Sequence, residues 1–480
     1  MDHAEIEKGY VDLDPIFGPG SVAVIGATDK PGKVGHAIML NYIDVGFSGR
    51  IYPVNLKAGS TIMGYRAYRS VLDIGEDIDL AVIAVPADSV PDVLDECGRA
   101  HVRGAVVVSG GFAEVGATEL QASIVEVAKR YGMPVIGPNC LGVMDVRARN
   151  DTLFLPTFKI DRPKVGGVSF VSQSGSVGST TLDLISGAGF GLSRFISYGN
   201  AATIDETDIL RYLMHDVHTQ VIVLYVEGVK RGRAFIDVAG EVTSMKPVVV
   251  LKAGTTQAGA AAARSHTAAL AGSDEAYDAV FRQYGFVRAN DTDELLDFAK
   301  IFDTQPLATG SRVAVITNGG GHGILATDAL YHNRLELARL SAKARRRLRG
   351  AMPGTVNIAL PLDIGGDADA QRFEDALEAV GGEPTVDALM VIVLFQTPGA
   401  DEKVVESIMN FGARREKPMV VVSVGGSYTR SHAAVMESSG IPVYRSTSAA
   451  ARSIAALVRY ARYRERVRAE AEAAAVASKH

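Results

Sequence analysis

His266 and Glu227 are the two residues of this chain whose types and settings favour chemistry at a histidine. Small residues flank His266 on both sides, so a reactant can reach its imidazole ring. Glu227 follows a run of apolar residues, where a strand is expected to end. A carboxylate bound to one ring nitrogen fixes the tautomer and makes the other nitrogen a better nucleophile. The alternative is a surface histidine and an unrelated strand-end carboxylate.

A turn formed by Ser172, Gln173, Ser174 and Gly175 is the second element suited to chemistry. It follows the apolar run 167–171 and precedes a helical stretch. Small residues let backbone N–H groups approach an anion at the start of a helix. Position 170 is Phe, so the turn does not match the Gly-x-Ser-x-Gly elbow of a hydrolase. The alternative is a serine that only caps the helix, which is worth about 1 kcal/mol.

The loop from Gly26 to Gly35 also joins an expected strand to an expected helix, which points backbone N–H groups at a phosphate. Its spacing is not Gly-x-Gly-x-x-Gly, and the second strand lacks the acidic residue that binds an NAD ribose. A Walker loop is excluded because Val34 follows Lys33. The nearby lysines, Lys30, Lys33 and Lys57, suit a more anionic ligand such as the 3′-phospho-ADP of coenzyme A. The alternative is a tight turn with solvated lysines.

These loops share one setting, a β-branched run that ends in a glycine-rich turn and opens into a helix. The setting occurs at 21–28, 167–175 and 312–323. It predicts an α/β fold, with an N-terminal Rossmann-like domain followed by two flavodoxin-like, doubly wound parallel-sheet domains. We expect the domains at 1–150, 151–305 and 306–480. The stretches 147–164 and 303–311 are predicted to be connectors, and 460–480 a helix.

Composition limits the classes of function. The chain has 480 residues, and its 49 Lys and Arg against 55 Asp and Glu give a net charge of −6, which disfavours general binding of nucleic acid. Two cysteines form no disulfide framework, and no Cys/His spacing suits zinc, so no metal site is expected. No signal peptide or membrane-length apolar run is found, so a cytoplasmic location is expected.

Several longer stretches together give the chain a family resemblance. It resembles the α subunit of NDP-forming acyl-CoA synthetases, of the ADP-forming acetyl-CoA synthetase type, which are related to succinyl-CoA synthetase. The resemblance spans residues 12–465, and its most specific stretches are 109–116, 137–142, 172–175, 199–205 and 252–274. In the third domain, His322 stands where the family usually has Pro.

The resemblance implies an acid-thiol ligase that interconverts acyl-CoA, ADP and phosphate with carboxylate, ATP and CoA. His266 would carry the phosphoryl group, Glu227 would support it, and the turn from Ser172 to Gly175 would hold phosphate. The first domain would bind coenzyme A. The residues expected there are Gly26, Ala27, Thr28, Lys30, Pro31, Pro53, Asn55, Lys57, Val85, Pro86, Ser109, Gly110, Gly111, Asn139 and Cys140. The alternative for Cys140 is a plain buried thiol.

The resemblance also implies a partner, because no segment is left for an ATP-grasp domain. A separate ATP-grasp β subunit would carry Mg-ADP or Mg-ATP in a hetero-oligomer, for which α2β2 is one arrangement. The other substrate would be a small carboxylic acid or its acyl-CoA. Two alternatives are a non-catalytic CoA-binding or nucleotide-sensing protein and the scaffold half of a protein acetyltransferase.

Overall fold

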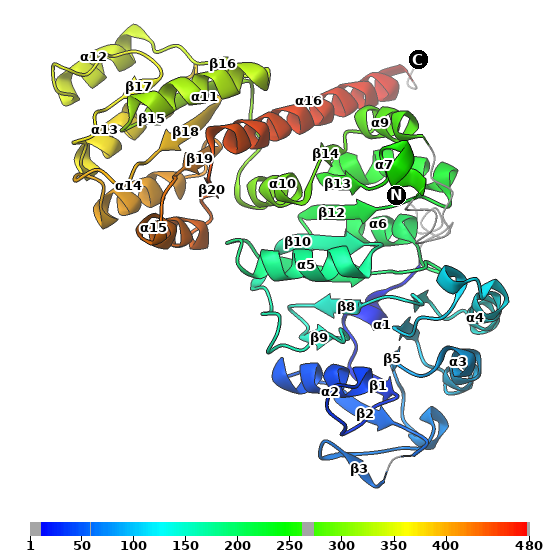
Figure 1. The fold of residues 1–480 in the computed structure, drawn as a ribbon. Coiled ribbons are helices and arrows are strands. Elements are labelled where there is room, and N and C mark those ends of the chain that lie inside the picture. The colour runs from blue at the N-terminus through cyan, green and yellow to red at the C-terminus, as the bar shows by residue number, and fades with distance from the viewer. Residues whose placement is uncertain (1–10, 58, 262–272, 478–480) are drawn as a thin grey trace. The chain divides into compact units, whose positions relative to one another are not determined.

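The computed structural model describes residues 11–57, 59–261 and 273–477, which belong to two compact units (Figure 1). The first unit runs to Gly187 and resumes from Gly191 to Thr292, and the second holds Ala188–Phe190 and the chain from Asp293. The predicted α/β fold with parallel sheets is confirmed. The three domain boundaries stay predictions.

The first sheet of the first unit is entirely parallel. Its order is β2-β1-β5-β6-β7. Alternate residues of β1 face different cores: Val22 and Val24 belong to the cluster that includes α2, and Ala23 and Ile25 to the one that includes α3 and α4. Helices therefore cover both faces, which explains the continuous apolar runs (Figure 1). The elements are α1 (Asp14–Phe17), β1 (Ser21–Ile25), α2 (Val34–Asp44), β2 (Arg50–Val54), β3 (Thr61–Ile62), β4 (Tyr65–Arg66), β5 (Leu80–Ile83), α3 (Val90–Arg99), β6 (Gly104–Val107), α4 (Thr118–Tyr131) and β7 (Val135–Ile136).

The second sheet of this unit has the order β14-β13-β12-β10-β11-β8-β9. Its first five strands are parallel, and β8 and β9 add an antiparallel edge. The core on one face of this sheet is continuous with the core beneath α2. The elements are β8 (Gly142–Asp145), β9 (Asn150–Asp151), β10 (Val165–Ser172), α5 (Gly175–Ser186), β11 (Leu192–Ser197), α6 (Glu206–His215), β12 (Val221–Val226), α7 (Gly232–Met245), β13 (Val248–Lys252), α9 (Asp274–Gln283) and β14 (Val287–Ala289).

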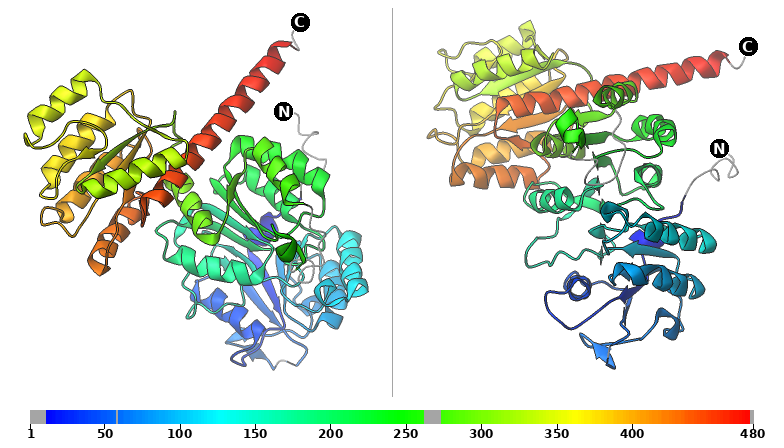
Figure 2. Two further views of the ribbon diagram at one scale, coloured as in Figure 1. Left: turned by 45° about the horizontal axis from the view of Figure 1, so that its top comes forward. Right: turned by 45° about the vertical axis from the view of Figure 1, so that its right-hand side comes forward.

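The second unit is built on a third parallel sheet, of order β16-β15-β18-β19-β20, with β17 paired to β15. Its last helix, α16, is continuous over its whole length (Figure 2), as predicted for the C-terminal tail. The elements are α10 (Thr292–Thr304), β15 (Arg312–Thr317), α11 (Gly320–His332), β16 (Glu336–Leu337), α12 (Ala342–Ala351), β17 (Leu362–Asp363), α13 (Ala370–Gly381), β18 (Ala388–Ile392), α14 (Glu402–Gly412), β19 (Met419–Val422), α15 (Ser427–Ser438), β20 (Val443–Tyr444) and α16 (Thr447–Ala477).

The three sheets share one strand order. Counted along the chain within each sheet, and leaving aside β17 and the antiparallel edge, the parallel strands are arranged 2-1-3-4-5. In this arrangement the chain switches direction between the first and third strands, and ligands bind outside the carboxyl ends of those two strands. The strand order therefore predicts ligand-binding positions at the loops after β1 and β5, after β10 and β12, and after β15 and β18.

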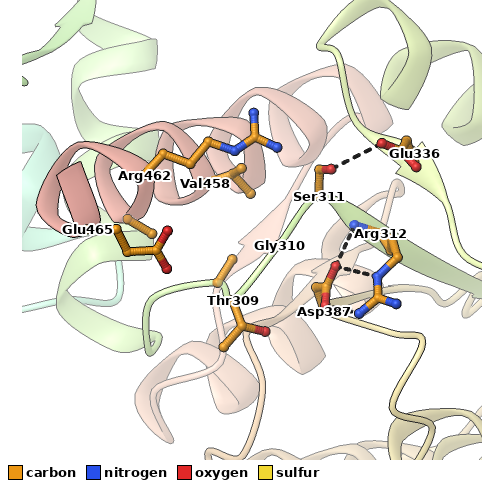
Figure 3. Close-up of a pocket in the computed structure, with 11 residues that line it drawn as sticks. Thr309, Gly310, Ser311, Arg312, Glu336, Asp387, Val458, Arg462 and Glu465 are labelled. Carbon is orange, nitrogen blue, oxygen red and sulfur yellow. Dashed lines mark hydrogen bonds and ion pairs between the residues drawn. The ribbon is translucent and has the colours of Figure 1, made fainter. Parts of the chain in front are cut away.

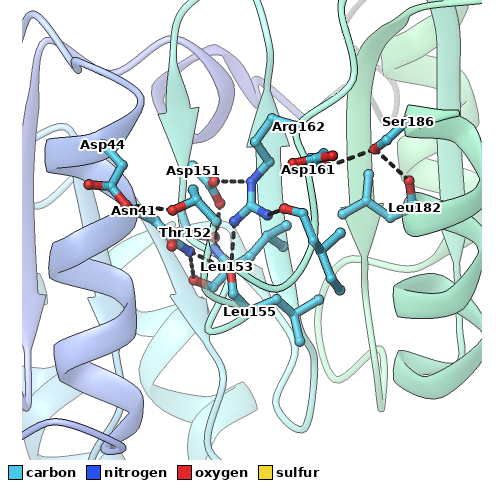
Figure 4. Close-up of polar contacts among 12 residues, drawn as sticks. Asn41, Asp44, Asp151, Thr152, Leu153, Leu155, Asp161, Arg162, Leu182 and Ser186 are labelled. Carbon is cyan, nitrogen blue, oxygen red and sulfur yellow. Dashed lines mark hydrogen bonds and ion pairs between the residues drawn. The ribbon is translucent and has the colours of Figure 1, made fainter.

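The segment between β9 and β10, which falls in the predicted connector 147–164, is held by a largely buried arginine (Figure 4). Arg162 donates from Nε to Asp151 at 2.7 Å and from Nη2 to the Leu155 carbonyl at 2.7 Å. Asn41 of α2 donates to the carbonyls of Leu153 and Leu155. Ser186 of α5 donates to the Asp161 carbonyl at 2.7 Å. The connector thus joins the helix that follows β1 to the helix that follows β10.

We predict that Arg162→Ala destabilises the first unit by about 3–5 kcal/mol, because it leaves a buried carboxylate without its cation. The side chains of Asp151 and Arg162 are only 1% and 12% exposed. Burial raises the pKa of Asp151 even with Arg162 beside it. The measurement is denaturant unfolding followed by circular dichroism. Arg50→Ala is the control, because it breaks an ion pair with Glu76 in which the Arg50 side chain is 60% exposed. The expected loss of unfolding free energy is under about 1 kcal/mol. Equal losses would contradict the prediction.

Candidate functional site

The loop after β1 is pressed between β5 and the first turn of α2. Gly26 has φ +97°, and a Cβ there would overlap the carbonyl oxygen of Ala84 at the end of β5. A Cβ at Gly35, in the first turn of α2, would overlap the Gly26 carbonyl oxygen. No side chain caps α2, so its first amides are left for another acceptor. Glycine is required here by contact between backbone segments.

Polar side chains join the carboxyl ends of neighbouring strands in this sheet. Asn55, just after β2, donates to the Ala27 carbonyl at 2.8 Å and accepts from the Lys57 amide at 2.9 Å. Ser109, after β6, donates to the Val85 carbonyl at 2.6 Å. These bonds fix the loops that were predicted to contact coenzyme A.

The predicted CoA residues fall into three groups by exposure. Lys30, Pro31, Lys57, Pro86, Gly110 and Asn139 are exposed at the ends of the strands, and Gly26, Thr28, Asn55, Val85, Ser109 and Gly111 are half-buried. Ala27, Pro53 and Cys140 are buried. Pro53 lies inside β2, paired with Val24. The Cys140 thiol donates to the Val107 carbonyl, and burial raises its pKa to about 12. Its surroundings are those of the buried thiol that the sequence left as the alternative.

The turn after β10 forms the start of α5. Ser174 is the N-cap residue, but its hydroxyl makes no capping bond and lies 3.2 Å from the Ser176 hydroxyl. Ser172 donates to the Ser174 carbonyl at 2.7 Å. The first amides of α5 therefore stay available, and the helix dipole adds partial positive charge. The turn has the properties of an anion site at the switch point of the second sheet.

Gln173 connects this turn to the end of β12. Its Oε1 accepts from the amides of Glu227 at 2.8 Å and Gly228 at 3.2 Å. The Glu227 side chain is buried, and the Tyr225 hydroxyl lies 3.5 Å from its Oε1. Burial and the charge of Glu227 raise the pKa of Tyr225 to about 12. Two predicted site elements, the turn and Glu227, are thus brought together by one carboxamide. His266 lies outside the described residues.

The carboxyl edges of the first and second sheets meet. Gly199, which follows β11, has φ +54°, and a Cβ there would lie 2.5 Å from Pro138 O and closer still to Asn139 O. Asn139 in turn donates from its amide to the Ser109 carbonyl at 2.8 Å. Two residues further on, Leu141 lies against Gly175 of α5 and donates from its amide to Ser197 at 3.1 Å. A continuous path therefore leads from the loops of the first sheet to the turn at the start of α5 in the second.

Two family models match parts of the chain. The description "CoA binding domain" matches residues 20–145, and "Succinyl-CoA ligase like flavodoxin domain" matches residues 165–302. The alpha subunit of acetate–CoA ligase [ADP-forming] I from Pyrococcus furiosus is 38% identical over 95% of this chain and 99% of its own length.

The chain belongs to the ADP-forming acetate–CoA ligase family.

Two further members of this family extend the comparison. The acetate–CoA ligase [ADP-forming] of Methanocaldococcus jannaschii is 40% identical over 94% of this chain, which spans 63% of that relative's length. The structure titled dinucleotide-forming acetyl-coenzyme A synthetase 1 from Ca. Korarchaeum cryptofilum, in complex with phosphate and ADP, has a TM-score of 0.90. It is 36% identical, and the match covers 96% of this chain and 99% of the other.

A network at the junction of the sheets was missed by sequence reasoning. Asn200 donates to Glu114 Oε2 at 2.5 Å and to Gln121 at 3.0 Å, and accepts from Asn139 at 3.2 Å. Partial burial works to raise the pKa of Glu114, but the bonds from Asn200 and the amides of Gly111 and Phe112 lower it. Glu114 and Asn200 both lie in stretches that carry the family resemblance, and that was the available signal.

Lys252, in another stretch of the family resemblance, ends β13 beside the end of β12. Its ammonium donates to the Ala253 carbonyl and lies 4.7 Å from the centre of the Tyr277 ring. Burial lowers the pKa of Lys252. It lines a cavity of about 710 Å³ at the carboxyl ends of β12, β13 and β14. On the same wall, Arg288 is paired with Asp274 and Asp278.

A cavity of about 320 Å³ in the second unit lies at the opposite edge of its sheet (Figure 3). Its walls include Arg312 and Glu336, which begin β15 and β16, and Arg462 of α16. Arg312 is paired with Asp387 at 2.6 Å. Because it lies at the amino ends of the strands, this cavity lacks the usual position of a ligand site in an α/β sheet. Among the described residues, no group of three or more acidic, His or Cys side chains suits a metal ion. No described helix is long and apolar enough to cross a membrane.

We predict that Gly199→Ala destabilises the first unit by roughly 2–4 kcal/mol and weakens CoA binding. The added Cβ makes the left-handed backbone conformation at position 199 unfavourable, and it overlaps the Asn139 carbonyl oxygen. Unfolding and calorimetric CoA titration measure the two effects. Gly232→Ala is the control, because a Cβ there meets nothing within 4 Å. A Gly199→Ala protein that unfolds and binds CoA like the Gly232→Ala protein would show that the close contact is unimportant.

Proposed function

We propose that this chain is the α subunit of an ADP-forming acyl-CoA synthetase of the acetate–CoA ligase type. It interconverts acyl-CoA, ADP and phosphate with a small carboxylic acid, ATP and CoA. The observation that carries the proposal is the junction of the two carboxyl edges, where Leu141 connects the loops of the first sheet to the turn at Gly175. A thioester held by the first sheet and a phosphate held at α5 are then neighbours.

Coenzyme A binds at the carboxyl edge of the first sheet. The tight loop at Gly26 and the uncapped first turn of α2 bind one phosphate group of coenzyme A. The exposed Lys30, Lys33 and Lys57 supply positive charge for its other phosphate groups. Asn55 and Ser109 hold the surrounding loops in place. The thiol end reaches the loop that contains Asn139, Cys140 and Leu141. The family model of a CoA-binding domain over residues 20–145 supports this assignment.

The first chemical step forms an acyl phosphate. A phosphate oxygen attacks the thioester carbonyl, a C–O bond forms, the C–S bond breaks and CoA leaves as its thiolate, which takes up a proton. The amides at the start of α5, with Ser174 and Gln173, hold the phosphate oxygens. Neutral donors fixed in advance stabilise the charge that develops without needing to reorganise.

The second step moves the phosphoryl group to His266. The ring nitrogen attacks phosphorus, a P–N bond forms, and the P–O bond to the carboxylate breaks. Glu227, fixed beside the turn through Gln173, binds the other ring nitrogen and stabilises the charge on the imidazole. Transfer from phosphohistidine to ADP completes the sequence and restores free His266.

Transfer to ADP takes place on a separate ATP-grasp β subunit that carries the nucleotide and Mg²⁺. Support comes from the relatives: the chain matches nearly the full length of the Pyrococcus furiosus alpha subunit but 63% of the Methanocaldococcus jannaschii ligase. The complex is a hetero-oligomer, with α2β2 as one arrangement.

We predict that His266→Ala abolishes labelling by acyl-CoA and labelled phosphate, whereas the wild-type chain takes up an acid-labile, base-stable label. Glu227→Gln should slow labelling by about 10–100-fold, the usual cost of losing the group that orients a histidine. Both variants should bind CoA like the wild type in calorimetry. His218→Ala, which changes an exposed histidine before β12, is the control. Full labelling of the His266→Ala protein would overturn the mechanism.

We predict that the purified chain makes no ATP by itself, because the proposed nucleotide site is on another polypeptide. Adding an ATP-grasp β subunit should restore ATP formation from acyl-CoA, ADP and phosphate, with the rate rising until the two chains are equimolar. Luciferase detection gives the rate, and mass spectrometry checks that no other chain is present. Sustained ATP synthesis by this chain alone would refute the division of labour.

A further inference from the structure

Two buried polar side chains, Tyr198 and Glu206, lie behind the turn at Ser174 and meet no hydrogen-bonding side chain among the described residues except each other. Tyr198 follows β11, and its amide donates to the Ser172 carbonyl at 3.1 Å. Glu206 is the first residue of α6 and is 1% exposed. Among the described residues, Glu206 Oε1 has no hydrogen bond, and the Glu206 carboxyl group is the single side chain with which the Tyr198 hydroxyl interacts as a hydrogen-bonding neighbour. Such groups cost stability when buried, so their retention calls for an explanation.

Tyr198 lies within electrostatic reach of two glutamates. Burial and the charges of Glu206, Asp205 and Glu227 raise its pKa well above the usual value. Glu206 therefore acts on Tyr198 from α6, and Glu227 acts on it from the end of β12. Because Tyr198 is also bonded to the first residue of the anion-site turn, the two carboxyl groups belong to one buried cluster behind that turn.

The other charged groups that face Glu206 are bound elsewhere. Arg231 is paired with Asp205 at 2.5 Å and Asp208 at 2.6 Å. Lys230 donates to the carbonyls of Asn200 at 2.6 Å and Ala201 at 3.3 Å. Tyr277 of α9 faces Glu206 and accepts from the Val229 amide at 3.0 Å. No described cation forms an ion pair with the Glu206 carboxyl group.

The protonation state of Glu206 follows from these surroundings. Burial, and then the charge of Asp205, raise its pKa to about 7, although Lys230 and Arg231 oppose the rise. Glu206 is therefore largely a neutral acid below pH 7 and largely a carboxylate above it. A neutral acid adds no charge to the cluster, whereas a carboxylate adds its negative charge to those of Asp205 and Glu227 near Tyr198.

We propose that Glu206 and Tyr198 are a positioning pair for Glu227: protonated Glu206 adds no charge to the cluster, and ionised Glu206 opposes phosphorylation of His266. The pair touches neither substrate nor phosphoryl group and acts through Glu227. The physical reason is that phosphoryl transfer brings further negative charge next to the cluster, where an additional carboxylate repels it. The inference rests on the proposed function.

The test compares the rate of labelling with acyl-CoA and labelled phosphate at pH 6 and pH 8. For one group with a pKa of about 7, the protonated fraction falls about tenfold over this range. We expect the wild-type rate to fall by about that factor and the Glu206→Gln rate to fall less than threefold, because a carboxamide cannot ionise. Tyr198→Phe should reduce the rate at both pH values. Glu241→Gln, at an exposed glutamate of α7, should keep the wild-type profile.

A second measurement uses thermal unfolding and needs no activity. A carboxyl group whose pKa rises on folding stabilises the folded state below its unfolded pKa, and this stability is lost as the pH rises through the folded pKa. The melting temperature of Glu206→Gln should therefore rise relative to the wild type by about 2–4 °C between pH 5 and pH 8. The Glu241→Gln protein should show no such change.

The outcomes distinguish failure of the proposed function from failure of the role of Glu206. A wild-type chain that takes up no label at either pH overturns the proposed function and the role of Glu206 with it. A wild-type chain that is labelled, together with a Glu206→Gln profile identical to it, overturns the positioning pair and leaves the proposed function standing. Parallel melting curves of Glu206→Gln and wild type across pH 5–8 overturn the protonation of Glu206.

Discussion

The contact between the backbone at Gly199 and the Asn139 carbonyl is the constraint on which the rest of the site depends. It requires a residue without Cβ in a left-handed conformation. It fixes the loop after β11 against the loop after β7, and the bonds from Asn200 to Glu114 and Gln121 extend the junction to the start of α4. The carboxyl ends of the strands of the two sheets are thereby brought to face a common space.

The shared strand order then determines which loops face that space. In each sheet the switch between the first and third strands separates two loops, and in the second sheet these are the turn at Ser174 and the segment at Glu227. Gln173 spans the gap, because its carboxamide oxygen accepts from two amides of the opposite loop. A single buried side chain thus fixes both halves of the proposed anion site, which explains why a carboxamide rather than a charged group is found there.

Much of this arrangement could be predicted from the sequence, because it depends on local patterns. The β-branched runs gave the parallel strands, and the glycine turns gave the ends where ligands gather. Contacts between distant segments could not be predicted from local patterns: Pro53 is buried by strand pairing, burial of Cys140 was only the alternative to a CoA contact, and Asn200 meets Glu114 only in the folded chain. Tyr198 and Glu206 could not be predicted as a buried pair for the same reason. In the sequence, Glu206 has the pattern of an ordinary acidic residue at the start of a helix.

The charges around the proposed anion site favour release of a phosphoryl group over tight binding of it. The side chains of the turn, Ser172, Gln173 and Ser174, are neutral. Among the described cations near Glu227 and the turn, Arg231 is bound by two aspartates, and Lys230 and Lys252 by backbone carbonyls. A phosphoryl group held by amides and hydroxyls is bound more weakly than one held by free cations, because charged hydrogen bonds contribute about twice as much as neutral ones. In the proposed reaction the group has to leave this site for a second one, and tight binding of the intermediate would slow that departure without helping its formation.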